Sequence, residues 1–217
     1  MSAGLLFYKL VRAVVVGLSR LLWRPSIIGR EHIPESGPFV LAPVHRSNID
    51  FALAAVLVKR RIRYMGKDSL WRIGWIGKIF SALGAFPVHR GSADREALRR
   101  CIEVINGGEP LVIFPEGTRQ SGDTVQPLFE GAAYIAARTG VPIVPVGIGG
   151  SEQAMPKGSK FVHPVKTVLV VGPVIPAPSA TEGARPSRRA IHDTTERLHV
   201  ELQRLFDDAQ ARTWSRS

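Results

Sequence analysis

Residues 45–50 read His45-Arg-Ser-Asn-Ile-Asp50 and join two apolar segments. Segment 38–44, Pro-Phe-Val-Leu-Ala-Pro-Val, predicts a buried strand, and segment 51–58, Phe-Ala-Leu-Ala-Ala-Val-Leu-Val, predicts the helix that follows. A histidine at a strand exit and an aspartate in the first turn of the next helix lie at the sheet edge where α/β proteins bind ligands. Histidine can accept a proton near neutral pH, and a neighbouring carboxylate can orient it. His45 and Asp50 are therefore candidates for a catalytic pair.

The same stretch also has a purely structural interpretation. Ser47 followed by Asp50 is typical of a helix start, with Ser47 as N-cap and Asp50 favoured by the helix dipole. Because residues five apart on a helix do not share a face, His45 can meet Asp50 only from outside the helix. The spacing recurs at His89 and Asp94, again between a predicted strand and a predicted helix. Spacing alone therefore does not choose the catalytic histidine.

The chain has 217 residues, of which 45% are hydrophobic, and a formal net charge of +11. This length is sufficient for one domain with a full core. Apolar and strongly basic composition together indicate an anionic partner surface, either a membrane or a nucleic acid. The single cysteine, Cys101, excludes an internal disulfide and a cysteine-rich zinc site, and its helical context places it in the core. No metal-ligand cluster is visible, so we expect no metal requirement.

The N-terminal segment, residues 3–22, is apolar with basic side chains gathered on one helical face. Its uncharged run 13–19 is far too short to cross about 30 Å of hydrocarbon. It is also a poor signal peptide, because charges interrupt the apolar part. We therefore expect residues 1–24 to form an amphipathic helix on a membrane surface, with Trp23 and Arg24 as interfacial anchors. An amphipathic helix packed on the domain is the alternative.

Strand-like and helix-like segments alternate through residues 25–217, which we treat as one domain. Strands are predicted at 38–44, 62–65, 84–89, 110–115, 141–148 and 167–172, and helices at 48–58, 69–83, 93–106, 129–139 and 188–211. This alternation predicts an α/β fold with a mostly parallel central sheet flanked by helices. The strand exits then bring His45, Arg90 and residues 116–119 to one edge.

Four motifs resemble those of the glycerolipid acyltransferase family, which contains the 1-acylglycerol-3-phosphate acyltransferases. They are His45-Arg-Ser-Asn-Ile-Asp50, Gly84-Ala-Phe-Pro-Val-His-Arg90, Phe114-Pro-Glu-Gly-Thr-Arg119 and Val141-Pro-Ile-Val-Pro145, in the family's order. The resemblance covers about residues 25–175. It gives the catalytic position to His45, because His89 lies inside the second motif.

The resemblance implies acyl transfer from a thioester to a hydroxyl of a glycerol phosphate. His45 would be the general base, and Asp50 would orient it and stabilise the imidazolium; no covalent acyl-enzyme is implied. Arg119 and Arg90 would hold the acceptor phosphate, as arginine can do bidentately. Lys67 resembles a phosphate-binding lysine found a similar distance beyond the family histidine.

Roles around the third motif stay open. Backbone N–H groups of Gly117 and Thr118 could stabilise the oxyanion or support the loop. Glu116 could bind the glycerol or buttress the loop. The family often has a lysine where this chain has Glu130, which leaves another glycerolipid or hydroxylated lipid as an alternative to a lysophosphatidic acid-like acceptor.

Basic residues outside the motifs would attract anionic headgroups, at about 1 kcal/mol per charge near the surface. The same field would attract coenzyme A or an acidic acyl carrier protein, and the resemblance implies that one of these carries the acyl group as donor substrate, without a further cofactor. The expected protein is a monotopic enzyme of phospholipid biosynthesis that makes phosphatidic acid at the cytoplasmic face of a membrane. A non-catalytic lipid-binding protein is a second hypothesis. Nucleic-acid binding is a third, which charge alone motivates and no signature supports.

Overall fold

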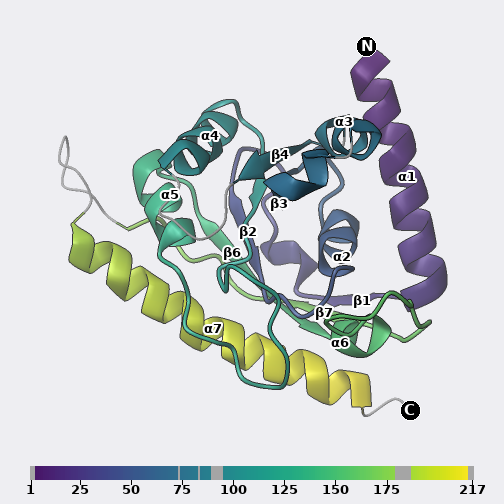
Figure 1. The fold of residues 1–217 in the computed structure, drawn as a ribbon. Coiled ribbons are helices and arrows are strands. Elements are labelled where there is room, and N and C mark those ends of the chain that lie inside the picture. The colour runs from purple at the N-terminus through teal and green to yellow at the C-terminus, as the bar shows by residue number, and fades with distance from the viewer. Residues whose placement is uncertain (1–2, 73, 83, 89–94, 179–186, 215–217) are drawn as a thin grey trace.

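The computed structural model describes residues 3–72, 74–82, 84–88, 95–178 and 187–214. Its sheet has the strand order β1-β7-β6-β2-β5-β3-β4 (Figure 1). The strands are β1 (Ser26–Ile28), β2 (Val40–Pro43), β3 (Arg63–Lys67), β4 (Ala85–Val88), β5 (Leu111–Val112), β6 (Ile143–Gly149) and β7 (Val168–Val171). All pairings between these strands are parallel except β6 with β7. The predicted α/β fold with a mostly parallel sheet is confirmed.

Helices cover both faces of the sheet. The α-helices are α1 (Ala3–Trp23), α2 (Asp50–Leu57), α3 (Gly74–Ala82), α4 (Arg95–Asn106), α5 (Gly131–Thr139), α6 (Ser151–Ala154) and α7 (Arg188–Trp214), and the 3-10 turns are η1 (Arg30–His32) and η2 (Asp68–Arg72). Figure 1 shows α4, α5 and α7 on one side of the sheet and α1, α2 and α3 on the other, with α1 outermost. Every residue of β2, β5 and β6 is buried, as expected for strands covered on both faces. Cys101 is buried in the core, as predicted.

Two glycines allow α7 to lie directly against β6. A Cβ on Gly147 would lie 2.2 Å from the Leu205 carbonyl oxygen, and one on Gly149 would lie 2.4 Å from that of Ala209. A larger residue at either position would push the helix away from the sheet. This contact fixes the C-terminal helix on the face opposite α1.

Two local predictions were wrong. The single helix expected at 69–83 is replaced by η2 and α3, because Trp71 folds back over Gly77, where an added Cβ would lie 2.9 Å from the Trp71 ring. Ser47 is not the N-cap of the next helix: α2 begins at Asp50 with Ile49 as its N-cap. The Ser47 hydroxyl instead donates a hydrogen bond to the Met155 carbonyl oxygen, at 2.8 Å.

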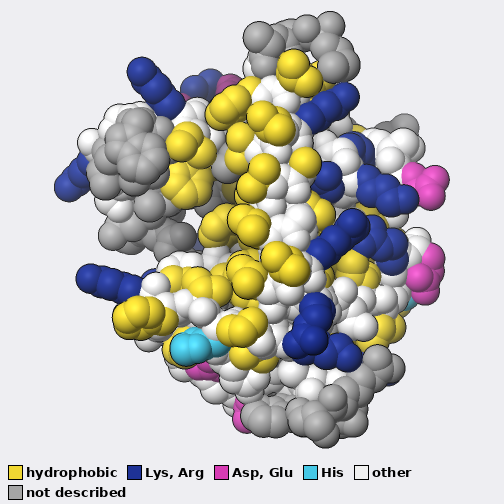
Figure 2. Space-filling view, turned by 90° about the vertical axis from the view of Figure 1, so that its right-hand side faces the viewer, with side chains coloured by type: hydrophobic (Ala, Val, Ile, Leu, Met, Phe, Trp, Pro, Cys, Tyr) yellow, Lys and Arg dark blue, Asp and Glu magenta, His cyan; other side chains and the backbone are white. Residues whose placement is uncertain are grey.

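One face of α1 packs on α2 and the core, and the other is exposed and apolar. Trp23 is buried, so its predicted role as an interfacial anchor is wrong, whereas Arg24 is exposed. The exposed apolar side chains run along the helix in Figure 2 and are Leu6, Phe7, Leu10, Val14, Leu18 and Leu21. Among the described residues, no helix is long and apolar enough to cross a bilayer.

Arginine side chains hold the C-terminal end of α2. Arg12 of α1 donates hydrogen bonds to the carbonyl oxygens of Ala55 (3.0 Å) and Val58 (2.5 Å). Arg30 binds the two carbonyls between them, those of Val56 and Leu57. Carbonyl groups at a helix end have no partner within the helix, and positive charge is favoured there. The helix that carries Asp50 is thus held at its far end by α1 and η1.

Candidate active site

His45 and Asp50 meet in the way that a catalytic pair requires. His45 lies just beyond β2, outside the helix, and its Nδ1 is 3.0 Å from Oδ2 of Asp50. The same oxygen accepts backbone N–H groups of Arg46 and Ser47, both at 2.7 Å. Asp50 is fully buried, so these contacts fix its carboxylate. A carboxylate at Nδ1 keeps the proton on that nitrogen and leaves Nε2 free to act as a base.

The third motif holds the backbone of His45 from the neighbouring strand. β5 lies beside β2, so the loop after β5 reaches the end of β2. The His45 N–H donates to Oε2 of Glu116 at 2.9 Å, and the His45 carbonyl accepts the N–H of Gln120 at 2.8 Å. The Phe114 ring stacks on the imidazole, with ring centroids 4.0 Å apart and an interplanar angle of 22°. Together these contacts position the imidazole ring.

A buried ion pair lies directly behind the histidine. Arg46, only 1% exposed, donates from Nη1 to both carboxylate oxygens of Glu116 at 2.8 Å. Its other nitrogens donate to the carbonyls of Gly122 (3.2 Å) and Thr124 (3.0 Å). Its guanidinium also lies 4.7 Å from the centre of the Phe206 ring on α7. Arg46 was missed by the sequence reasoning, because the partners that explain it lie about 70 or more residues away.

The contacts of Glu116 favour loop support over direct substrate binding. Its side chain is closed to solvent, and its oxygens accept hydrogen bonds from Arg46, from the His45 backbone and from the N–H of Gln126. A carboxylate with this set of partners has no face open to a glycerol hydroxyl. Its charge is balanced by Arg46, as burial requires.

The amides proposed for the oxyanion are already in use within the same loop. The Gly117 N–H donates to the Phe114 carbonyl at 3.0 Å, and the Thr118 N–H donates to the Glu116 carbonyl at 2.8 Å. Both groups therefore support the turn rather than point free into a site. Gly117 has a φ of +70°, and an added Cβ would lie 2.6 Å from the Phe129 ring. The turn thus needs glycine at this position.

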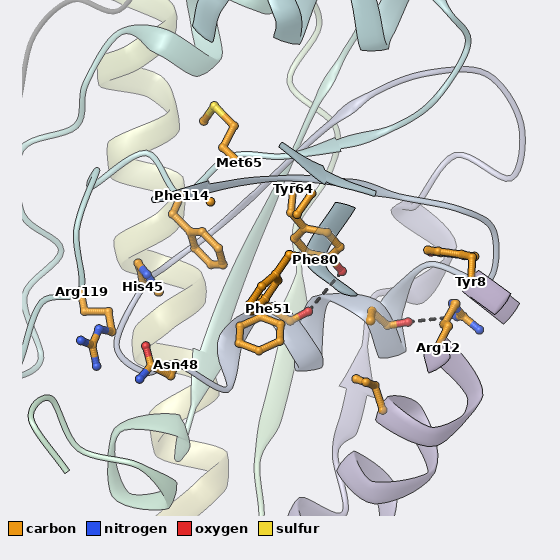
Figure 3. Close-up of a pocket in the computed structure, with 14 residues that line it drawn as sticks. Tyr8, Arg12, His45, Asn48, Phe51, Tyr64, Met65, Phe80, Phe114 and Arg119 are labelled. Carbon is orange, nitrogen blue, oxygen red and sulfur yellow. Dashed lines mark hydrogen bonds between the residues drawn. The ribbon is translucent and has the colours of Figure 1, made fainter. Parts of the chain in front are cut away.

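An elongated pocket of about 570 Å³ begins at His45. Figure 3 shows His45, Asn48 and Arg119 at one end and Tyr8 and Arg12 of α1 at the other. The lining between the two ends is mainly apolar and includes Phe51, Tyr64, Met65, Phe80 and Phe114. Its volume is in the range of ligand-binding pockets.

Two polar groups in the pocket differ in charge: the Tyr64 phenol is neutral, and the Arg119 guanidinium is positive. Burial raises the pKa of the Tyr64 phenol, which therefore stays protonated and donates to the Phe51 carbonyl at 3.2 Å. Arg119 makes no hydrogen bond or ion pair with a described residue and lies at the same end as His45. Its guanidinium is thus a cation available to an anionic ligand.

The remaining predicted phosphate ligands are only partly described. Lys67 is the last residue of β3, which lies next to β5, so its backbone is at the same sheet edge as Arg119. Its side chain lies outside the described part of the structure. Arg90, with His89 and Asp94, also lies outside the described residues. Within those residues, no group of three or more His, Cys, Asp or Glu side chains is placed to hold a metal ion.

Comparisons with known proteins identify the family of the chain. A family model described as Acyltransferase matches residues 24–149, a range that includes all four motifs. The chain is 30% identical over 181 residues to "1-acyl-sn-glycerol-3-phosphate acyltransferase" of Bacillus subtilis (strain 168), covering 83% of this chain and 87% of the relative. It is 31% identical over 157 residues to "1-acyl-sn-glycerol-3-phosphate acyltransferase BAT2, chloroplastic" of Brassica napus, covering 70% of this chain but 45% of the relative. The chain therefore spans about half the length of that plant protein.

A solved structure has the same fold. It is the crystal structure of the 1-acyl-sn-glycerophosphate (LPA) acyltransferase, PlsC, from Thermotoga maritima, with a TM-score of 0.72 and 25% sequence identity. The match covers 91% of this chain and 80% of that one. The motifs, the fold and the matched family model lead to one conclusion: this chain belongs to the acyltransferase family.

Proposed function

We propose that the protein transfers a fatty acyl group from a thioester to the free hydroxyl of 1-acyl-glycerol-3-phosphate, which gives phosphatidic acid. The observation that carries the proposal is the His45–Asp50 pair at the mouth of an apolar pocket that also contains the cation Arg119. A lipid-binding protein without catalysis has no need of a base held by a buried carboxylate. The names of the relatives supply the acceptor.

In the proposed mechanism, Nε2 of His45 takes the proton of the acceptor hydroxyl as its oxygen bonds to the thioester carbonyl carbon. The tetrahedral intermediate then collapses, the C–S bond breaks, and His45 returns the proton to the leaving thiolate. Asp50 stabilises the imidazolium that forms between the two steps. The acyl group passes directly from donor to acceptor, so no side chain is acylated.

The pocket separates the polar and apolar parts of the substrates. The acyl chain of the donor lies along the apolar lining, with the thioester carbonyl at His45 and the chain end towards α1. The acceptor phosphate binds Arg119, which guanidinium geometry suits, and we assign Arg90 and Lys67 to the same phosphate on the family motifs alone. The donor is acyl-coenzyme A or acyl carrier protein.

Glu130, which stands where the family often has a lysine, lies away from the pocket. This residue is the N-cap of α5, and its carboxylate lies 3.5 Å from Nδ1 of His192 on α7. It does not line the pocket, so its negative charge is not among the groups around Arg119. Glu130 in place of the family lysine thus leaves the charge at the Arg119 end of the pocket unchanged.

We further propose that α1 lies on a membrane surface through its exposed apolar face. Six large apolar side chains are exposed along this helix, from Leu6 to Leu21. The first thirty residues contain Lys9, Arg12, Arg20, Arg24 and Arg30 and no acidic residue. A basic amphipathic helix of this kind suits an anionic interface. The far end of the pocket is formed by α1, so such attachment places the pocket next to the lipid.

The test is formation of phosphatidic acid from labelled acyl-coenzyme A or acyl carrier protein and lysophosphatidic acid. The same assay is run with other lysoglycerolipids that lack the phosphate monoester. The proposal predicts product with lysophosphatidic acid and a much lower kcat/KM with the others. Turnover of a neutral acceptor at the same kcat/KM would contradict the role of Arg119 and favour the alternative acceptor.

A further inference from the structure

The 156–166 loop, which joins α6 to β7, presents an exposed apolar tip. Phe161 is 77% exposed and Val162 is 46% exposed. Neither side chain packs into the core. Exposing an aromatic ring to water does not stabilise the folded protein. Exposed apolar groups rimmed by polar residues often mark a contact with a membrane or partner.

Hydrogen bonds hold this tip in its outward position. The Ser159 hydroxyl donates to the Phe161 carbonyl at 3.1 Å and accepts the Phe161 N–H at 3.0 Å. The turn before it is closed by the Ser159 N–H donating to the Pro156 carbonyl, at 3.0 Å. The turn after it is tied by the His163 N–H to the Ala154 carbonyl, at 2.7 Å. The exposure of Phe161 therefore belongs to an ordered loop.

Positive charge surrounds the tip. Lys157, Lys160 and Lys166 belong to the loop, and none of them makes an ion pair or hydrogen bond with a described residue. The sequence has no acidic residue from 153 to 181. Lysines around an exposed aromatic ring match the chemistry of an anionic lipid surface, where lysines bind headgroups and the ring enters the interface.

The loop lies next to the C-terminal end of α1. The Thr167 N–H, directly after the loop, donates to the carbonyl of Trp23, the last residue of α1, at 2.9 Å. The Thr167 carbonyl accepts the N–H of Ser26 at 3.0 Å. Figure 1 shows the green loop beside the C-terminal end of α1. Figure 2 shows apolar side chains on this side of the molecule with Lys and Arg side chains at its margins.

We propose that the 156–166 loop is a second membrane contact: Phe161 and Val162 enter the interface of an anionic bilayer, and Lys157 and Lys160 bind its headgroups. The inference rests on the attachment of α1 under the proposed function. With α1 alone, the protein could roll about the helix axis. A second contact at one end of α1 fixes the orientation of the pocket relative to the bilayer.

The first test places an environment-sensitive nitrobenzoxadiazole probe on a new cysteine of the full-length protein. Cys101 is buried, so a cysteine in F161C, L10C or V200C is the one that reacts. L10C reports on α1, and V200C is the control, an exposed aliphatic site on α7, the helix on the side of the sheet opposite α1. Vesicles of phosphatidylcholine and phosphatidylglycerol should shift the emission to the blue for probes at 161 and 10 and leave that at 200 unchanged.

The outcomes separate the two proposals. A shift at position 10 without one at 161 overturns the loop contact and keeps the attachment of α1. No shift at either position overturns both. A shift at 200 equal to that at 161 shows non-specific adsorption and also overturns the loop contact.

The second test measures how the positive charge of the loop lysines contributes to vesicle binding. K157A/K160A is compared with R188A/R189A, which removes the same charge from the start of α7. The loop variant should bind anionic vesicles more weakly by about fivefold per lysine, with little change on pure phosphatidylcholine. Its turnover of detergent-dispersed substrate should match wild type. Equal losses in the two double variants would mean that net charge alone acts, which overturns the assignment.

Discussion

Removing the guanidinium behind His45 should cost the protein much of its stability. The change is Arg46→Met, which replaces the charged side chain with an apolar one of similar length. It removes the buried partner of Glu116 and leaves the carbonyls of Gly122 and Thr124 without their donors. Breaking a buried ion pair from one side costs about 3–5 kcal/mol, because the remaining charge is uncompensated.

This cost is large against the total stability of a domain, which is about 5–15 kcal/mol. For a protein of this size it corresponds to a melting temperature lower by about 6–20 °C. Arg204→Met is the matched control, because Arg204 forms an exposed pair with Glu201 at 2.6 Å. An exposed pair contributes up to about 1 kcal/mol. Urea unfolding followed by circular dichroism measures both variants.

A double variant tests whether the uncompensated charge is the cause. Arg46→Met/Glu116→Gln should be more stable than Arg46→Met alone, because it no longer buries a lone carboxylate. In activity assays below the melting temperature, Arg46→Met should lower kcat more than it raises KM, since Arg46 contacts the His45 backbone and does not line the pocket. An unfolding free energy within about 1 kcal/mol of the Arg204→Met value would refute this reasoning.

Three further changes have defined outcomes. Gly117→Ala should destabilise by up to about 1 kcal/mol more than Gly37→Ala in urea unfolding, because both positions have positive φ but only at Gly117 must the new Cβ displace the exposed Phe129 ring; equal losses would show that the ring contact costs nothing. Arg12→Ala removes the cation at the α1 end of the pocket and should shift the preferred donor towards longer acyl chains in a competition assay; an unchanged profile would show that Arg12 does not close the pocket. Treatment with a chelator should leave the transfer rate within about twofold, and loss of activity that added metal restores would contradict a metal-free mechanism.

Sequence patterns predicted the fold well because its signals are local. The apolar runs of β2 and β6, and the alternation of strands with helices, come directly from short periodic patterns. The motif His45 to Asp50 lies between a strand and a helix, and this placement alone put the pair at the sheet edge. The contact of 3.0 Å between the two side chains agrees with that expectation.

Other features depend on contacts that no local pattern contains. Glu116 had two interpretations, and the choice between them depends on Arg46, which lies 70 residues earlier in the chain. Trp23 looked like a membrane anchor because aromatic and basic residues adjoin at the helix end. Its burial follows from which face of α1 meets α2, which depends on tertiary packing. The break between η2 and α3 likewise depends on Trp71 folding over a glycine.

The central claim is that His45 is the general base, and the rate of acyl transfer by the His45→Ala variant tests it most directly. The measurement is the rate of phosphatidic acid formation at saturating donor and acceptor for wild type, His45→Ala and His192→Ala, the last a control at an exposed histidine. General-base catalysis is worth about 100- to 10,000-fold. His45→Ala should therefore lose at least about 100-fold in kcat at a temperature where circular dichroism shows it folded, its vesicle binding should match wild type, and His192→Ala should keep its activity. A His45→Ala rate within about tenfold of wild type would contradict the account.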